Sequence, residues 1–288
     1  MAFGKTENSR GDKSNTSIGA GCWALWPGKA RQCWRFSLVV HPRFFSAQPL
    51  PHPSAGAIDF DVDDDIARHL HVLRIGVDER VTLFDGSGGE WSAVVSRIDK
   101  RHARVRLLAF DAIERESPLT ITLVQALAMS DKMDFIVQKA VELGVSAIQP
   151  ITSERATLKL MGERAQKRVM HWQAVTRAAC EQCGRNRIPV VAEIVAFESW
   201  VDKTVDGVRL VLHPQGRSSL VSSVNATAPL SIMIGPEGGF SDHEIALTAR
   251  HGIKAVTIGP RVLRTETAGL AALAALNAVS GDFQDDWR

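Results

Sequence analysis

Two glycine-rich turns, each preceded by a short apolar run, place the strongest constraint on how this chain can fold. The first run, Leu230 to Ile234, has the pattern of a strand covered on both faces, and it ends at Gly235-Pro236-Glu237-Gly238-Gly239. The second run, Ala255 to Ile258, ends at Gly259-Pro260-Arg261. Glycine permits positive φ and lets a ligand approach the backbone closely. Two such turns at the carboxyl ends of adjacent strands predict a ligand site at that edge of an open α/β sheet.

A helix is predicted after each turn. Ser241 and Glu244 have the spacing of an N-terminal capping box, and the helix that they open should end near Gly252. Thr265 begins a second helix, rich in Ala and Leu, that should last to about Ser280. Strand, turn and helix therefore alternate twice within this stretch.

The charged residues at the start of the second helix allow a functional interpretation. Arg264 precedes the first helical turn, where the macrodipole does not favour a positive charge, so a ligand or substrate partner is the better explanation for it. Glu266 lies in the first turn, where the dipole favours a carboxylate whether or not it has a function. The first glycine turn alone could be merely structural, because it lacks the lysine of a P-loop and the G-x-G-x-x-G of a dinucleotide fold.

The rest of the chain divides into two predicted domains, which differ in the spacing of their apolar residues. Residues 41–114 show short strands, at 81–85 and 91–98 among others, and one short helix at 64–72, which predicts a small β-rich domain. Residues 114–118 form the expected linker. Residues 118–288 alternate apolar strands with helical patterns, which predicts a mainly parallel sheet with helices on both faces.

Charge is locally uneven although the whole chain is nearly neutral, at +2. Between Arg155 and Arg187 there are eight Lys or Arg against two acids, an excess that phosphate binding would explain and that a solvated helix face explains in part. Within this stretch Arg185 is the favoured candidate for nucleic-acid binding or catalysis. In the β-rich domain the basic run 97–106 is opposed by five aspartates within 59–65, so only one face of that domain can contact RNA.

Several compartments and cofactors are disfavoured. No apolar run reaches the roughly 18 residues of a membrane span, so we expect a soluble protein without a membrane partner. Cys180 and Cys183 have C-x-x-C spacing, but Cys22 and Cys33 do not complete a zinc site, so we predict no metal and reduced thiols in a cytoplasmic protein. Residues 1–40 have neither a clean signal peptide nor a transit peptide, and we expect a disordered extension.

Motifs in a fixed order along most of the chain, from about Pro42 to Leu276, give a family resemblance. The segments are Arg43-Phe44-Phe45, His69-Leu70-His71-Val72-Leu73-Arg74, Asp131-Lys132-Met133-Asp134, Val141-Glu142-Leu143-Gly144-Val145, Glu181-Gln182-Cys183-Gly184-Arg185, Leu212-His213-Pro214-Gln215-Gly216, and the two glycine turns with their helices. Their order is more specific than any one of them. Together they resemble the ribosomal RNA small subunit methyltransferase E family, which is similar to other RNA methyltransferases of the SPOUT class.

The resemblance implies an α/β fold in which a trefoil-knotted SPOUT domain with a mainly parallel sheet, 118–288, follows a PUA-like RNA-binding β-barrel, 41–114. It implies S-adenosylmethionine as methyl donor, N3 of a uridine in 16S ribosomal RNA of the small ribosomal subunit as acceptor, and a homodimer. The donor should be held by turns that contain Leu212, His213, Gly216, Gly235, Pro236, Glu237, Gly238, Ile258, Gly259, Leu263 and Thr267.

Candidate catalytic and RNA-binding residues complete the predicted site. We expect Arg264 to stabilise the negative charge that develops on the uridine oxygens, or to hold an RNA phosphate, with Arg185 in support. Glu266 is either a general base or, better supported, a residue that caps the helix or orients Arg264. The candidates for RNA binding are Arg43, Arg74, Lys132 and Arg155.

Two other functions remain open at this point. A SPOUT enzyme that acts on a ribose 2′-oxygen or on transfer RNA would share the donor site and yield a different modified nucleoside. A non-catalytic RNA-binding protein would use the glycine turns only as structure and would not bind S-adenosylmethionine.

Overall fold

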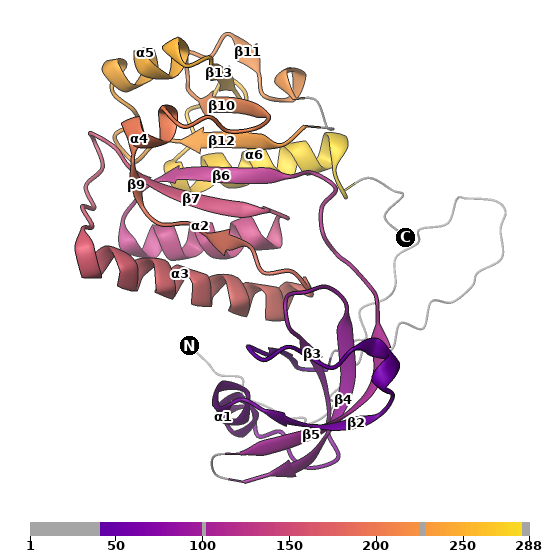
Figure 1. Ribbon diagram of the computed structural model, residues 1–288. Coiled ribbons are helices and arrows are strands. Elements are labelled where there is room, and N and C mark those ends of the chain that lie inside the picture. Colours follow the sequence, from indigo (N-terminus) through magenta and orange to yellow (C-terminus); the bar gives the residue numbers. More distant parts are fainter. Residues whose placement is uncertain (1–40, 100–101, 225–227, 284–288) are drawn as a thin grey trace, which may run out of the picture. The chain divides into compact units, whose positions relative to one another are not determined.

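The computed structural model describes residues 41–283 except 100–101 and 225–227, and these described residues belong to one compact unit (Figure 1). The expected extension 1–40 lies outside the described residues, as do Cys22 and Cys33. Within the described part, the strands form two separate sheets.

The first sheet is built from the β-rich part of the sequence. Its five strands have the order β1-β3-β4-β5-β2, in which β1 and β3 are parallel and the other neighbours are antiparallel. The predicted strands and the predicted helix are confirmed to within a residue or two at their ends. The elements are β1 (Arg43–Phe45), η1 (Pro53–Ala55), β2 (Ile58–Val62), α1 (Asp64–Val72), β3 (Arg80–Phe84), β4 (Glu90–Ile98) and β5 (Ala103–Asp111).

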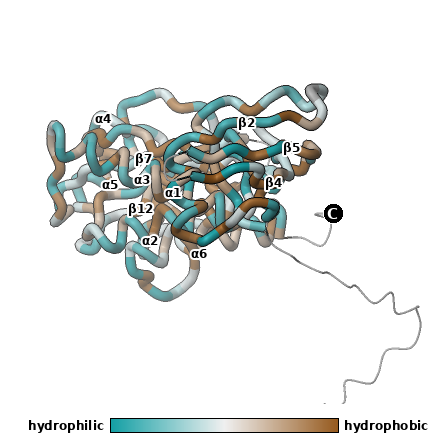
Figure 2. The backbone as a smooth tube through the Cα atoms, turned by 90° about the horizontal axis from the view of Figure 1, so that it is seen from below, coloured by the Kyte–Doolittle hydropathy of each residue, from teal (hydrophilic) through white to brown (hydrophobic). Residues whose placement is uncertain are grey.

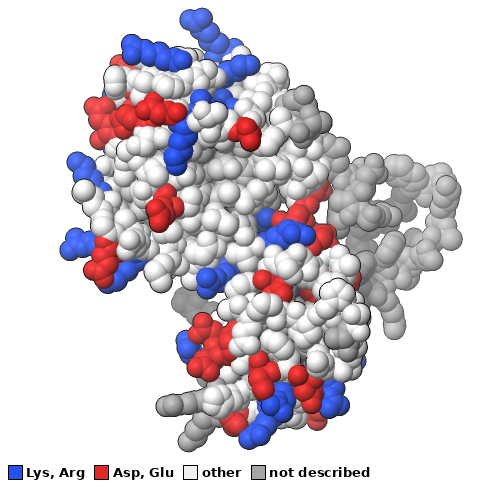
Figure 3. Space-filling model, in the orientation of Figure 1, with Lys and Arg blue, Asp and Glu red and all other residues white. Residues whose placement is uncertain are grey.

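The basic outer face of β5 is neutralised by the neighbouring strand. Hydrophobic and hydrophilic residues alternate along the first half of β5 (Figure 2), so its arginines point away from the core. Arg104 pairs with Asp61 at 2.7 Å and Arg106 pairs with Asp59 at 3.1 Å, across the β2–β5 ladder. Acidic and basic side chains accordingly lie side by side over this part of the molecule (Figure 3). The aspartates of β2 thus offset the positive charge that the sequence suggested for an RNA-binding face.

The second sheet is wholly parallel among the described strands, as predicted. Its order is β11-β13-β10-β12-β6-β7-β8, with β9 also paired to β7. The trefoil knot implied by the resemblance concerns chain threading, which strand order does not define, and it stays a prediction, as do the two domain boundaries. The elements are β6 (Ile121–Ala126), α2 (Ser130–Glu142), β7 (Ala147–Thr152), α3 (Gly162–Cys183), β8 (Val190–Val191), β9 (Val195–Ala196), α4 (Phe197–Val201), β10 (Val208–Leu212), β11 (Ser218–Ser219), η2 (Val221–Ser223), β12 (Leu230–Ile234), α5 (Asp242–Arg250), β13 (Lys254–Thr257) and α6 (Thr265–Ser280).

Helices cover both faces of this sheet, which explains why its central strands are mostly apolar. Leu123 and Ile232 face a core that includes α2, α3 and α6. Val124 and Met233, next along the same strands, face a second core with α4 and α5. Because β12 lies at the centre of the sheet, between β10 and β6, and both faces are covered, it is buried at all five positions.

Glu90 of β4 joins the first sheet to the segment that leads into the second. Its carboxylate accepts hydrogen bonds from Arg43 and, at 3.1 Å, from Arg115. Desolvation alone would raise the pKa of Glu90, but these two guanidinium groups outweigh it and hold the pKa below its ordinary value of 4.5. Arg43 and Arg115 also donate to the carbonyl oxygens of Arg185 and Gly184 at the end of α3.

The lowered pKa of Glu90 predicts an acid-sensitive contribution to stability. A carboxylate with a depressed pKa stabilises the fold above its unfolded pKa and loses that contribution as the pH falls through its folded pKa. Glu90→Gln should therefore be less stable than wild type at pH 7, and the difference should shrink below about pH 4.5, the ordinary glutamate range. Urea unfolding at a series of pH values measures this, and a difference that stays constant with pH would contradict it.

Candidate donor and RNA site

The two glycine turns and the turn after β10 lie together at one edge of the second sheet. The strands β13, β10 and β12 are neighbours and parallel, so their carboxyl ends meet at that edge. The loops that follow them enclose a cavity of about 590 Å³. Its lining combines residues of the predicted turns, among them Pro214, Gln215, Gly239 and Val262, with Phe240 and Asp242, which lie just beyond the first glycine turn.

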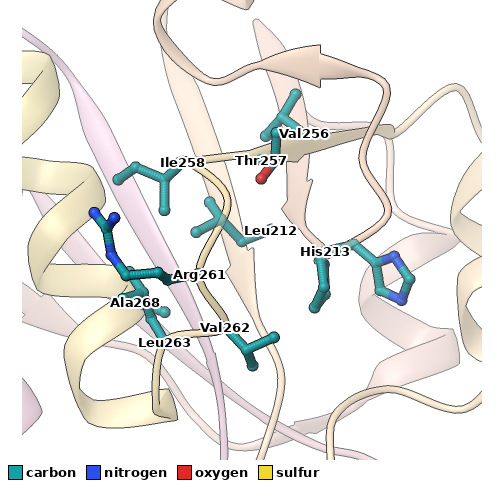
Figure 4. Close-up of a pocket in the computed structure, with 10 residues that line it drawn as sticks. Leu212, His213, Val256, Thr257, Ile258, Arg261, Val262, Leu263 and Ala268 are labelled. Atoms are coloured by element: carbon teal, nitrogen blue, oxygen red, sulfur yellow. The ribbon is translucent and has the colours of Figure 1, made fainter.

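A smaller cavity of about 70 Å³ adjoins the same loops. Figure 4 shows Leu212 and His213 at the end of β10, Val256 and Thr257 on β13, and Ile258, Arg261, Val262 and Leu263 in the next loop, gathered around it. Leu212, His213 and Leu263 line both cavities, so the two are parts of one depression. The signal for this site was the repeated pattern of apolar strand followed by glycine turn.

Most of the predicted donor-binding residues are brought together here. Gly235, Pro236, Glu237 and Gly238 line the larger cavity, and Ile258 lines the smaller one. Gly216 and Gly259 line neither, although they belong to turns that do, and Thr267, in the first turn of α6, also lines neither. The role of each residue toward a donor stays a prediction.

Gly216 supports the site by letting two backbones touch. A Cβ at this position would lie 2.4 Å from the carbonyl carbon of Val256 and 2.7 Å from its oxygen, so no side chain fits. We expect Gly216→Ala to displace β13, to cost about 1–3 kcal/mol of stability as overpacked sites do, and to weaken ligand binding in the adjoining cavity. Thermal unfolding and calorimetry measure the two effects. Gly76→Ala is the control, because nothing lies within 4 Å of its Cβ, and equal effects in both variants would contradict the argument.

The first glycine turn is held from two directions. Arg155 donates to the carbonyl oxygens of Gly238 at 3.3 Å and Phe240 at 3.4 Å. From the other side, Glu237 accepts a hydrogen bond from the backbone of Met129 at 3.1 Å. Met129 is the N-cap of α2 and supplies no side-chain cap, so Glu237 caps that helix from a distant part of the chain.

Lys132 of α2 lies between two carboxylates at the cavity wall. Its Nζ is 3.4 Å from Glu237 and 3.3 Å from Glu266. Partial desolvation alone would lower the pKa of Lys132, but these carboxylates outweigh it and raise the pKa above 10.5. Desolvation would likewise raise the pKa of Glu237, but the hydrogen bond from Met129 and the charge of Lys132 hold it below 4.5. Lys132 and Glu237 are therefore both charged at neutral pH.

Arg264 extends from the rim of the larger cavity. Its side chain is 83% exposed and its Nη1 lies 4.0 Å from Glu266. Arg264 is the N-cap residue of α6. Its backbone is extended, and its side chain makes no capping hydrogen bond to the helix. Among the predicted catalytic residues, Arg264 and Glu266 are brought together at the cavity.

A buried polar network behind the cavity was not anticipated. Gln125, fully buried on β6, donates to Thr265 Oγ1 at 3.0 Å, and that hydroxyl donates to the carbonyl oxygen of Gly235 at 2.6 Å. The network ties the start of α6 to the first glycine turn. The sequence signal was a glutamine within an otherwise apolar strand, because buried polar groups need partners.

The structure does not bring Arg185 to the cavity, which corrects the prediction that it supports Arg264. Its guanidinium is 6% exposed and paired with Glu116, and it also donates to the carbonyl oxygens of Val141 and Val145. All of these bonds lie at the end of α3, near the linker. The side chain therefore has a structural role there.

The four predicted RNA-binding residues lie in three different surroundings. Arg43 is 9% exposed, donates to Asn186 at 2.7 Å and pairs with Glu90, so its guanidinium is occupied within the protein, against the prediction. Arg74 is exposed at the end of α1 with a positive φ of 57°. Lys132 and Arg155 line the cavity.

The described part of the chain contains neither a candidate membrane span nor a candidate metal site. No helix there is long and apolar enough to cross a membrane. No group of three or more His, Cys, Asp or Glu in those residues is arranged to hold a metal ion. Cys180 is buried and Cys183 half-buried, both as free thiols, and burial raises the pKa of Cys180 to about 12.

Comparison with known proteins agrees with this geometry. Residues 115–277 match the model of an RNA methyltransferase domain, and residues 62–108 match that of an RNA methyltransferase PUA domain. Ribosomal RNA small subunit methyltransferase E from Buchnera aphidicola is 32% identical over 213 residues, which cover 74% of this chain and 87% of the relative. The chain belongs to the ribosomal RNA small subunit methyltransferase E family.

Other members of the methyltransferase E family extend the match. The protein from Mycobacterium bovis is 32% identical over 243 residues, which cover 82% of this chain and 91% of that relative. A crystal structure of the Neisseria gonorrhoeae member, bound to S-adenosyl methionine, has a TM-score of 0.80 and 41% identity, covering 85% of this chain and 100% of that one. The predictions of the family, of the parallel α/β fold and of a PUA-like N-terminal domain are confirmed.

Proposed function

We propose that this rRNA methyltransferase transfers a methyl group from S-adenosylmethionine to N3 of a uridine in 16S rRNA of the small ribosomal subunit. The observation that carries the proposal is the cavity formed by the loops after β10, β12 and β13, with Arg264 at its rim. Membership of the methyltransferase E family supports the donor and the class of RNA.

The lining fits such a donor. A cavity of about 590 Å³ is within the size range of small-molecule sites. Apolar side chains of Leu212, Ile234 and Leu263 suit an adenine ring, and the backbone of the glycine turn offers polar groups without side chains in the way. The carboxylates of Glu237 and Glu266 suit a molecule that carries positive charge.

The protein's own residues then have defined tasks. The donor supplies a methyl group already activated by its sulfonium, so the protein has to align the reacting atoms and exclude water. Uridine N3 carries a proton at neutral pH, and its loss leaves negative charge on O2 and O4. Arg264, exposed at the rim, would stabilise that charge as it develops. Glu266 is paired with Lys132, and this favours a role in orienting Arg264 over one as general base.

The RNA surface, assembly and location are parts of the same proposal. Arg74 is exposed and free to meet phosphate, whereas Arg43 and Arg185 are engaged within the protein. We also propose that the protein is a homodimer. Light scattering tests this, and a monomeric mass at micromolar concentration would contradict it. A cytoplasmic location suits two free thiols, and fractionation of cells would test it.

The deciding experiment is methyl transfer from labelled S-adenosylmethionine to small ribosomal subunits, followed by nucleoside analysis of the RNA. The expected product is labelled 3-methyluridine. Label in a ribose 2′-O-methyl nucleoside, or only in transfer RNA, would retain the donor site and overturn the acceptor. A folded protein that does not bind the donor would overturn the proposal as a whole.

A further inference from the structure

Three parts of the cavity wall meet at the ammonium group of Lys132. Glu237 belongs to the first glycine turn, Glu266 to the first turn of α6, and Lys132 itself to the first turn of α2. A lysine is not favoured by the macrodipole at a helix N-terminus, so α2 by itself gives no reason for it. The two carboxylates, from other parts of the chain, account for its position.

The ion pairs around Lys132 continue through Glu266 to the rim of the cavity. Glu266 has a side chain that is only 19% exposed, and its other oxygen lies 4.0 Å from the guanidinium of Arg264. Arg264, at 83% exposure, has no other ion pair among the described residues. Glu237, Lys132, Glu266 and Arg264 therefore form a row of alternating charge along one wall.

We propose that Lys132 is a positioning residue that holds Glu266, and through it Arg264, in place for methyl transfer, and does not bind RNA phosphate. The inference rests on the proposed function. Without the ammonium group, Glu237 and Glu266 would face each other as like charges in a partly desolvated wall, and they would separate. Arg264 would then lose the carboxylate that limits its movement.

The first test is the split between kcat and KM in Lys132→Met, which keeps the length and apolar stem of the side chain. We expect kcat to fall by at least about tenfold, since small misplacements of a catalytic group have effects of that order or larger. The KM for RNA should change little. Lys132→Arg, which keeps a positive charge with several donors, should retain most of the rate.

The second test is rescue by a neutral partner. In Lys132→Met/Glu237→Gln the repulsion is removed, the glutamine oxygen can still cap α2, and Glu266 keeps its charge. We expect this double variant to recover a substantial part of the lost kcat, a coupling that independent residues do not show. Lys139→Met is the matched control, because Lys139 is in the same helix and, among the described residues, forms an ion pair only with Glu142, at 2.7 Å. It should behave as wild type.

Two outcomes would overturn the inference. One is a Lys132→Met enzyme whose kcat equals that of Lys139→Met. The other is a raised KM for RNA, with a weaker dependence on salt and no rescue by Glu237→Gln, as expected of a phosphate contact. Failure of the proposed function would look different, because the wild-type protein itself would then bind no donor or methylate no subunit.

Discussion

Replacing Arg264 with alanine is expected to lower kcat by about 10²–10³-fold, the usual effect of removing a group that stabilises charge in the transition state. Affinity for S-adenosylmethionine should stay close to that of wild type, because the side chain is exposed at the rim and makes no hydrogen bond to the cavity loops. Single-turnover methylation of small subunits measures the first quantity, and calorimetry with the donor alone measures the second.

Arg250→Ala is the control for loss of a guanidinium group. Arg250 is an exposed residue in the last turn of α5 and does not line the cavity. Unchanged methylation by Arg264→Ala would mean that another group stabilises the negative charge that develops on the uridine oxygens. A large loss of donor affinity would instead make Arg264 part of the donor site.

Replacing Arg185 with alanine is expected to destabilise the protein by about 3–5 kcal/mol, the usual cost of removing one partner of a buried ion pair. Glu116 would be left with an uncompensated charge, and the carbonyl oxygens of Val141 and Val145 would each lose a donor. Urea unfolding at neutral pH measures the loss. At a temperature where the variant is folded, its kcat should match that of wild type.

Arg187→Ala is the matched control for this prediction. Arg187 pairs with Glu114 at 3.4 Å, two residues from the first pair along both segments, but its side chain is 56% exposed. A surface pair of this kind contributes about 0–1 kcal/mol. Equal stability losses in the two variants would contradict the argument from burial. A fall in kcat without loss of stability would return Arg185 to the catalytic candidates.

Local patterns in the sequence were sufficient to predict the elements that build the site. The apolar run that became β12 is buried at every position, and the predicted capping box of Ser241 and Glu244 is present at the start of α5. The helix predicted from Thr265 to Ser280 has those bounds in the structure. Each of these predictions depends on a pattern within a few residues, namely an apolar run, a capping box or a helical composition, which the sequence shows directly.

The roles of charged residues were predicted less well. Arg43 and Arg185 lie in motifs of the family, and nothing within a few residues of either indicates burial. Their partners Glu90 and Glu116 are 47 and 69 residues away in the sequence. When the partner of a charged residue is that distant, the local sequence does not show whether the residue is buried or exposed.

The sequence by itself determined the parallel sheet, the two glycine turns at its edge and, by resemblance, the family. Only the tertiary structure decided which charges reach the cavity: Lys132 and Arg155 do, while Arg43 and Arg185 are used to join the segments around the linker. The physical reason is that turns and caps follow from local hydrogen bonding, and a buried strand or helix shows its pattern of apolar residues within its own few residues. Ion pairs depend instead on where the fold brings distant segments together, as when Glu237 reaches Lys132 and the start of α2.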